Sequence, residues 1–319
     1  MPVAEPGSVD GSAADGGLTG RAWLAALPAE LAAQRHVMGR LADLCEDWPL
    51  VMSLLVGCSL GRGAADALSD IDAGLGVDAP PGEAGADRIA ATEAMVVAAL
   101  PEMGALVDVL RHRTGPDSQH VRRIFAQFAD GTQLDLAILA ADGIETRRRA
   151  GGAPDFVTLY QAPPGSGEAD EATPFDGHGS GGAPPQAAYA VTGEQVREWA
   201  FHGWCMLIDA DKYLRRGSLW EAHSRLHEAR HHIWALWAAA NGAMYPWHGL
   251  SQVLDHDPGN LPPGIESTVA GLDLPGLRQA ARASAQVLTT ASEAAARRYP
   301  ADLPAAMAAY VTNALAREP

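Results

Sequence analysis

Short runs of apolar residues, bounded by glycine, proline and acidic residues, dominate the first half of the chain. Runs of this length are typical of buried strands. They lie at 50–56, 71–77, 105–111, 123–129, 132–139 and 156–160. The fourth and fifth runs are joined through Asp130-Gly131, a pair that accepts the positive φ angles of a two-residue turn, which predicts a hairpin. Together the runs predict a mixed sheet of about five strands.

Apolar residues at helical spacing mark two further elements in this half. Residues 19–46 carry the spacing with an interruption at Pro28, which opens a second helix ending near Cys45. Another helix is predicted at about 84–100. The first half therefore combines a sheet with helices that can cover it.

The second half is helical throughout. Thr192-x-x-Gln195 indicates a capping box that opens a helix ending at Gly217. Ser218-x-x-Glu221 indicates the start of the next. Further helices rich in alanine are predicted at 276–299 and 304–317.

A segment rich in proline, glycine, serine and acids separates the two halves, and such composition is typical of a linker or mobile loop. We therefore predict an α+β fold, with a first domain built on the mixed sheet and a C-terminal α-helical bundle. The predicted boundaries are a flexible tail at 1–18, the sheet domain at 19–161, the linker or mobile loop at 162–188 and the helical domain at 189–319.

Charge and composition limit which kinds of binding partner are expected. The formal net charge is −16, from 39 acidic and 23 basic residues, and no basic run follows the pattern of a nucleic-acid-binding surface. A nucleic-acid partner is therefore not expected, and a small or cationic substrate is. No apolar run approaches the ~18 residues of a membrane span, and the first residues lack the pattern of a signal peptide. We expect a cytoplasmic protein without membrane contact, either a monomer or a homodimer.

Three aspartates are placed for metal chemistry. Asp70 and Asp72 begin a predicted strand, where a spacing of two puts both side chains on one face. Asp135 lies on the second strand of the predicted hairpin. Its side chain is on the face opposite to that of its apolar neighbours, so a third carboxylate projects from this strand. Paired carboxylates of this kind hold the magnesium ions of phosphoryl and nucleotidyl transfer.

A glycine-rich loop precedes these aspartates. Gly57, Gly61 and Gly63 allow the backbone N–H groups to turn towards phosphate, and the Ser59 hydroxyl is available for the same target. A loop or an Asp-x-Asp pair alone is weak evidence, because both are common in solvated turns. Their order between two strand patterns, followed by a third aspartate in a strand, is more specific.

At this point the sequence resembles a known superfamily. SLGRGAADALSDID at 59–72 is similar to the pattern of polymerase-β-like nucleotidyltransferases, with a Gly-Ser, a variable loop containing Arg-Gly and a closing Ser-Asp-x-Asp. FADGTQLDLAIL at 128–139 is similar to the corresponding hairpin of the aminoglycoside adenylyltransferases. The resemblance covers roughly residues 50–160.

The resemblance implies specific roles. Asp70, Asp72 and Asp135 would bind Mg²⁺, two ions being expected, and would form the catalytic centre. The loop, with Gly57 and Gly63 in its backbone and the side chains of Ser59 and Arg62, would bind the triphosphate of a nucleoside triphosphate, ATP being the first expectation. Lys212, the only lysine in the chain, matches the lysine or arginine that related enzymes bring from the helical domain over the triphosphate.

Several assignments have alternatives. Cys58 stands where the superfamily has a glycine before its serine, which bears on how closely the backbone approaches phosphate. Asp108 competes with Asp135 as third carboxylate. Lys212 could equally be a solvated residue near a helix C-terminus, where cations are favoured. The general base is open between Asp135 and two glutamates of the helical half, Glu221 and Glu228.

Histidines recur every four residues at His223, His227 and His231, which places three imidazoles on one helix face. A polar helix face explains them better than a metal site. Arg225 followed by His231 or His232 also fits the loose pattern of a helical ribonuclease family, a pattern short enough to arise by chance.

The leading expectation is thus a transferase that moves NMP from ATP to a hydroxyl of a small, cationic molecule of the aminoglycoside type, as in antibiotic resistance. The alternative is a regulatory or toxin–antitoxin module that acts on RNA or protein.

Overall fold

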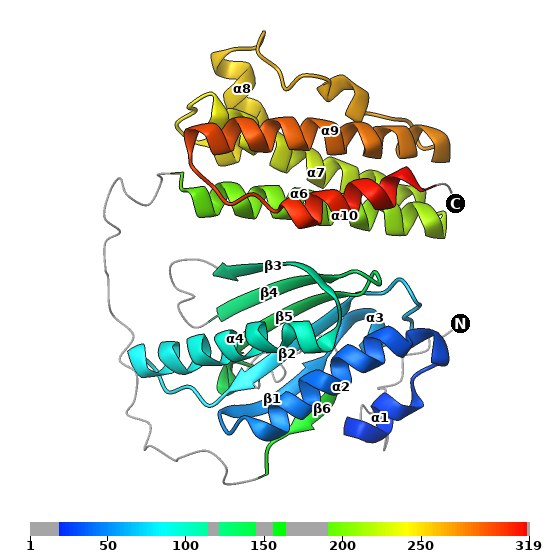
Figure 1. The fold of residues 1–319 in the computed structure, drawn as a ribbon, viewed down its shortest axis with the longest axis vertical. Coiled ribbons are helices and arrows are strands. Elements are labelled where there is room, and N and C mark those ends of the chain that lie inside the picture. Colours follow the sequence, from blue (N-terminus) through cyan, green and yellow to red (C-terminus); the bar gives the residue numbers. More distant parts are fainter. Residues whose placement is uncertain (1–18, 114–120, 145–155, 164–190, 318–319) are drawn as a thin grey trace, which may run out of the picture.

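The computed structural model describes residues 19–113, 121–144, 156–163 and 191–317. The predicted tail at 1–18 and nearly all of the predicted linker lie outside these ranges. Figure 1 shows a sheet region with helices on its near face, and a separate layer of helices beside one sheet edge. The fold is therefore α+β with a helical C-terminal region, as the sequence predicts.

Six strands form one mixed sheet in the order β3-β4-β5-β2-β1-β6. They are β1 (Val51–Val56), β2 (Ile71–Val77), β3 (Leu106–Arg113), β4 (Val121–Phe128), β5 (Gln133–Ala140) and β6 (Val157–Gln161). The predicted number of about five is one too low, because both outlying runs join the sheet: β3 pairs with β4 at one edge and β6 pairs with β1 at the other.

One strand pair is parallel, and it lies at the centre of the sheet. β2 and β5 run side by side in the register Ile71↔Leu134 and Asp72↔Asp135, while the other pairs are antiparallel. Apolar side chains on both strands are buried, including Ile71 and Leu136. This burial fixes the register, since a slip of one residue would turn the apolar side chains to the wrong face.

The β4–β5 hairpin forms as predicted, but its turn is longer. The Phe128 amide donates to the Thr132 carbonyl at 2.9 Å, which leaves three residues in the loop instead of two. Gly131 alone has a positive φ, of 102°, and the Asp130 carboxylate accepts from the Thr132 amide at 2.9 Å. Asp130 stays in an ordinary conformation because its side chain closes the turn.

Helices of the first half cover one face of the sheet (Figure 1). They are α1 (Gly20–Ala26), a 3-10 turn (Ala29–Leu31), α2 (Ala32–Asp47), the short α3 (Cys58–Gly61) and α4 (Glu83–Met103). The break between α1 and the turn falls at Pro28, as predicted. Buried side chains of α2 and α4, such as Met38 and Val96, complete a core with the sheet.

The helical region has a second core. Its elements are α6 (Gly193–Arg216), α7 (Leu219–Ala240), a 3-10 turn (Pro246–His248), α8 (Leu250–His256), a 3-10 turn (Ile265–Thr268), α9 (Leu274–Arg298) and α10 (Ala305–Ala316). Helices α6 and α10 both contact the edge strand β3. The side chain of Leu110, on that strand, belongs to the helical core and joins the two regions.

The predicted ends of α6 are confirmed. The Thr192 hydroxyl accepts from the Gln195 amide at 3.2 Å, and Gly217 ends the helix at φ 72°. The second predicted cap is wrong in detail: α7 does follow Ser218, but the Ser218 side chain accepts no capping hydrogen bond.

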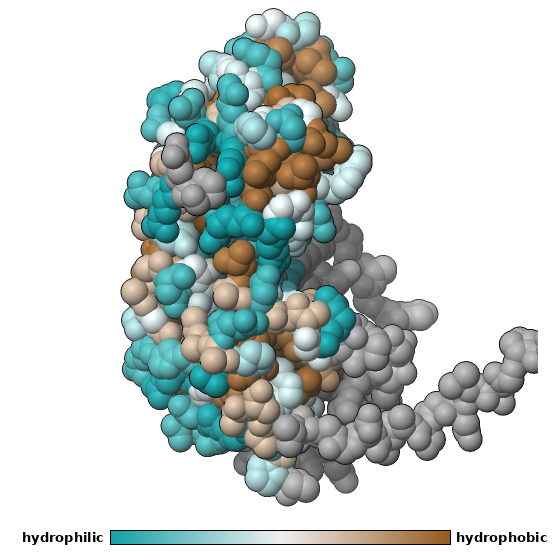
Figure 2. All heavy atoms as spheres, turned by 90° about the vertical axis from the view of Figure 1, so that its right-hand side faces the viewer, coloured by the Kyte–Doolittle hydropathy of each residue, from teal (hydrophilic) through white to brown (hydrophobic). Residues whose placement is uncertain are grey.

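No helix within the described ranges is long and apolar enough to cross a membrane. Figure 2 shows a largely hydrophilic face with a hydrophobic patch in its upper part, at the level of the helical region. Large exposed apolar side chains of that region include Met244, Leu250, Leu254 and Val269.

Glu93, on α4, is the buried charge of the sheet region. Its side chain is 2% exposed and receives hydrogen bonds from Arg111 at 2.9 Å and Arg122 at 2.6 Å. Both contacts help to lower its pKa although burial alone would raise it. The carboxylate therefore stays charged inside the fold because two arginines on neighbouring strands hold it.

We predict that Glu93→Gln lowers the free energy of unfolding by about 3 kcal/mol, because it leaves the enclosed Arg122 without its anion. The measurement is chemical denaturation. Glu102→Gln, on the same helix, is the control: Glu102 is 67% exposed and pairs with Arg40 at the surface, so its loss should cost less than about 1 kcal/mol. Equal effects of the two changes would contradict the role given to Glu93.

Candidate functional site

Three aspartates border one hollow. Asp72 and Asp135 are direct neighbours across the parallel β2–β5 pair, and Asp70 immediately precedes β2. The hollow has a volume of about 250 Å³ and lies between the sheet and helices α6 and α7. The remaining residues of its lining come from β4, β5, α6 and α7: Phe125, Ala126, Gln127, Gln133, Leu134, Phe201, His202, Cys205, Met206, Asp209 and Arg225. We call this hollow the carboxylate cleft.

The carboxylates of the cleft repel one another. Burial, followed by the charge of Asp70, raises the pKa of Asp72. Burial also raises the pKa of Asp135 to about 6; the charges of Asp72 and Asp70 act in the same direction and Arg123 opposes them. Holding these carboxylates close together therefore costs free energy, and a cation bound in the cleft would offset their repulsion.

Arg123, on β4, provides part of the compensation. Its guanidinium donates to both oxygens of Asp135, from Nε at 3.2 Å and from Nη2 at 2.5 Å. The sequence analysis missed this residue, although the hairpin register, which puts Arg123 opposite Ala137, places it within reach. A metal bound by Asp135 would share that carboxylate with Arg123.

Lys212, on α6, provides the second cation. Its side chain is 6% exposed, with Nζ 3.1 Å from Asp209 and 3.6 Å from Asp70. Burial lowers its pKa, but Asp209 and Asp70 more than offset this, so the ammonium is retained. The alternative of a solvated residue near a helix end is therefore wrong for Lys212. The description of a solvated residue near a helix end fits Arg215 instead, whose half-exposed side chain pairs with Asp211 on the same helix.

Asp209 adds a fourth carboxylate that the sequence analysis did not single out. It stands three residues before Lys212 on α6, and Arg225 of α7 approaches it at 3.8 Å. The i,i+3 spacing to the only lysine was the available signal. Four carboxylates and three cations, Arg123, Lys212 and Arg225, therefore meet in and around the cleft.

The glycine-rich loop is a single helical turn. The Gly57 amide donates to the Asp72 carbonyl at 2.9 Å, and the Gly61 amide donates to the Gly57 carbonyl at 3.1 Å. The amides of Ser59 and Leu60 stand in the first turn of α3, where a helix offers no backbone acceptor. Gly63 ends the turn at φ 68°. The Arg62 side chain is exposed beside it.

Cys58 has a positive φ of 52°, the only such value for a non-glycine residue in the described ranges. This explains why a glycine suits the position, since an L side chain is disfavoured there. Burial and the neighbouring Asp72 raise the pKa of the Cys58 thiol to about 11, so it stays protonated and donates to the Asp72 carboxylate. Cys58 thus has a disfavoured backbone conformation and gains a contact with the Asp72 carboxylate.

The segment from the loop to Asp70 is held from both regions of the molecule. Arg216 at the end of α6 binds the Asp66 carboxylate through Nε at 2.8 Å and through Nη2. From α2, the Gln34 side chain donates to the carbonyls of Ala67 at 3.2 Å and Ser69 at 3.0 Å. These contacts fix the approach of the chain to Asp70, and no sequence pattern indicated them.

The competing aspartate lies elsewhere. Asp108 is on β3, three strands from β2, and pairs with Arg197 at 2.8 Å. Of the described residues, the group of three metal-binding side chains whose ligand atoms all lie within 4.8 Å is His112, Glu198 and His202. Asp70, Asp72 and Asp135 do not form a group that tight.

The histidine stripe shows no converging triad. His227 and His231 contact each other, Nε2 to Nε2, at 3.3 Å on an exposed helix face, and His223 is not part of that contact. Of the two glutamates considered as bases, Glu221 is exposed and Glu228 pairs with Arg225 at 2.6 Å. Neither lines the carboxylate cleft.

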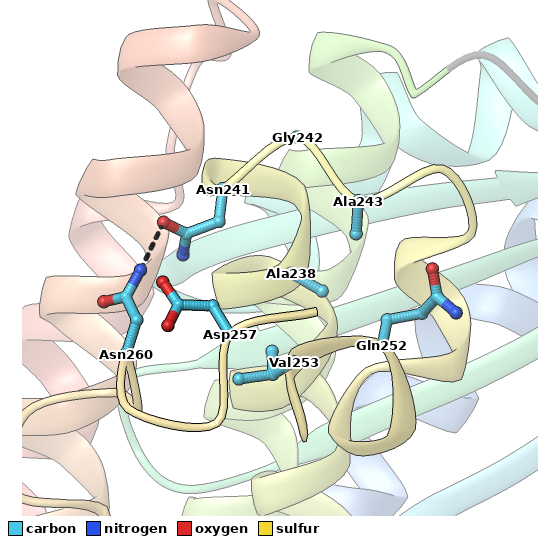
Figure 3. Close-up of a pocket in the computed structure, with 8 residues that line it drawn as sticks. All are labelled: Ala238, Asn241, Gly242, Ala243, Gln252, Val253, Asp257 and Asn260. Atoms are coloured by element: carbon cyan, nitrogen blue, oxygen red, sulfur yellow. Dashed lines mark hydrogen bonds between the residues drawn. The ribbon is translucent and has the colours of Figure 1, made fainter. Parts of the chain in front are cut away.

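Another hollow, of about 160 Å³, lies within the helical region (Figure 3). Its lining comes from the end of α7 and from the segment around α8, and the Asn260 amide donates to Asn241 at 2.9 Å. Asp257 is the only acidic residue of its lining. This second hollow therefore lacks the group of carboxylates found in the carboxylate cleft.

Comparison with known proteins shows no family for this chain. No family model and no curated protein matches the sequence. A solved structure, described as an aminoglycoside 6-adenyltransferase from Bacillus subtilis, is similar at a TM-score of 0.30 and 13% identity, over 89% of this chain and 99% of that one. A likeness of that size carries no conclusion on activity.

The backbone at Cys58 leads to a prediction. Cys58→Gly should make the protein more stable than Cys58→Ala by about 1 kcal/mol, because both changes remove the thiol but only glycine removes the side chain from a positive φ. Thermal and chemical unfolding of the two variants measure the difference. Alanine equal to or better than glycine would mean that the position carries no backbone strain.

Proposed function

We propose that this protein is a nucleotidyltransferase that moves NMP from a nucleoside triphosphate, ATP in the first place, to a hydroxyl of a small molecule, with release of pyrophosphate. The observation that carries the proposal is the direct pairing of Asp72 with Asp135, beside Asp70 and after a glycine-rich turn. The order of these features along the chain is the order of the superfamily that the sequence resembles.

The carboxylates fit divalent cations. Oxygen ligands are those that Mg²⁺ prefers. Burial first, and neighbouring carboxylates after it, raise the pKa values of Asp72 and Asp135, and a bound cation would offset both effects. Asp70, Asp72 and Asp135 would hold Mg²⁺, which supplies charge neutralisation at the reacting phosphate when bound. Arg123 would share the Asp135 carboxylate with the bound ion.

The chain's own residues supply positioning. The amides of Ser59 and Leu60, in the first turn of α3, would donate to a phosphate oxygen. Lys212 is anchored by Asp209, so its ammonium stays beside Asp70 and can contact a phosphate oxygen without first being ordered. Asp135 or Asp209, both in the cleft lining, would accept the proton of the attacking hydroxyl.

The expected acceptor is small and cationic. The cleft has a volume of about 250 Å³ and carries more carboxylates than cations. A protein of net charge −16 favours the approach of a polyamine-like molecule over that of a nucleic acid. An aminoglycoside-like antibiotic has the amino groups and hydroxyls that such a cleft would bind.

The first test changes one carboxylate. Asp70→Asn should lower the rate of pyrophosphate release by at least about a hundredfold, because charge compensation at the phosphate is lost. Asp108→Asn, the competing aspartate on the distant strand, should leave the rate close to wild type. An undiminished rate in Asp70→Asn would sink the assignment of the site.

The second test identifies the acceptor. ATP, GTP, CTP and UTP, each labelled at the α-phosphate, are incubated with the protein, Mg²⁺ and a panel of aminoglycosides, other hydroxylated small molecules, RNA and proteins. We expect label from ATP on a cationic small molecule. Label found only on RNA or protein would move the function to a regulatory or toxin–antitoxin module, and no transfer from any nucleotide would contradict the proposed function itself.

A further inference from the structure

A group of three metal-binding side chains lies where the sheet edge meets the helical region. His112 is on the edge strand β3, while Glu198 and His202 lie one turn apart on α6. Their ligand atoms all lie within 4.8 Å of one another. The group belongs to neither the glycine-rich turn nor the three aspartates.

The contact between His112 and Glu198 is unusual for a simple ion pair. His112 Nδ1 lies 3.0 Å from Glu198 Oε1, yet this buried nitrogen has no aligned hydrogen-bond partner. A carboxylate oxygen and an imidazole nitrogen that lie this close without a hydrogen bond between them are compatible with two ligands of one metal ion. Two ligands of a tetrahedral zinc ion lie about 3.4 Å apart, close to this separation.

His202 completes the group without another polar partner. Its ring packs edge to face with His112 at 6.0 Å and with Phe125 at 5.1 Å, and stacks on His232 at 5.7 Å. Within the described residues, neither ring nitrogen of His202 forms a hydrogen bond to the protein. The surrounding rings therefore fix its orientation and leave its nitrogens available.

Neighbouring cations do not neutralise Glu198. Arg197 pairs with Asp108, Arg123 with Asp135, and both Arg111 and Arg122 with Glu93. Across the described ranges, His112 is the one ion-pair partner of Glu198. In the described ranges, the Glu198 carboxylate is therefore left without an arginine or lysine partner.

The group is also accessible. The side chains of His112 and Glu198 are 21% and 28% exposed. His202 borders the carboxylate cleft, and Glu198 borders a further hollow of about 490 Å³. An ion could enter from solvent, and a water molecule could occupy the position that the protein leaves open.

From this arrangement we propose that His112, Glu198 and His202 form a second metal site, which binds a transition ion of the zinc type and ties β3 to α6. Two imidazoles and one carboxylate are a known ligand set for zinc, whereas magnesium prefers oxygen ligands alone. The site is separate from the three aspartates and does not depend on the proposed nucleotidyl transfer.

The test measures metal binding without nucleotide. The full-length protein is freed of metal with a chelator and titrated with Zn²⁺ by calorimetry and by competition with a chromogenic chelator. We expect one tight site per chain. Glu198→Gln, which keeps the side-chain shape, should weaken that site by at least about a hundredfold, as should His112→Asn.

Two controls keep the result specific. His227→Gln, in the exposed histidine stripe, and Asp70→Asn, in the carboxylate cleft, should each retain the tight site. Circular dichroism checks that every variant is folded, and Co²⁺ supplies a visible spectrum that should disappear in Glu198→Gln. Absence of a tight site in the wild type, or unchanged binding in Glu198→Gln and His112→Asn, would overturn the proposal.

Discussion

The parallel pairing of β2 with β5 is the constraint on which the candidate site depends. It places Asp72 against Asp135 without any contribution from loops, and the buried apolar residues of the same two strands keep the register. Like charges on adjacent strands oppose this pairing, so the fold must offset their repulsion. Arg123 and Lys212 do so from opposite sides, one from the sheet and one from α6.

Because the charges of the cleft come from both the sheet and the helices, the cleft lies between the two regions. The sheet supplies three carboxylates and one cation, and the helical region supplies Lys212, Asp209 and Arg225. Neither region alone balances the charge. The contacts of Arg216 with Asp66 and of Gln34 with the backbone before Asp70 then hold the connecting segment in place.

Local patterns in the sequence predicted most of the fold. Runs of apolar residues gave the six strand positions, and a capping box and a glycine gave the ends of α6. The predicted number of strands was wrong because it depends on which strands pair. The predicted length of the hairpin turn was wrong because the Asp130 side chain closes a longer turn. Asp70, Asp72 and Asp135 could be proposed from their spacing in predicted strands together with the resemblance to the superfamily. Arg123 and Asp209 each carried a local signal, the hairpin register and the spacing to Lys212, but their roles depend on contacts that only the folded chain shows. The His112 group could not be proposed, since it joins β3 to α6, which are distant in sequence.

Among the described residues, helix α6 carries polar links from the helical region to the sheet region at both of its ends. Arg197 and Glu198 near its start contact β3, while Lys212 and Arg216 near its end contact Asp70 and Asp66. A helix of 24 residues is about 36 Å long. The two regions are therefore joined along a line and not at a point. Contacts at both ends of so long a helix resist rotation of the sheet against the helical layer more than contacts at a single point would.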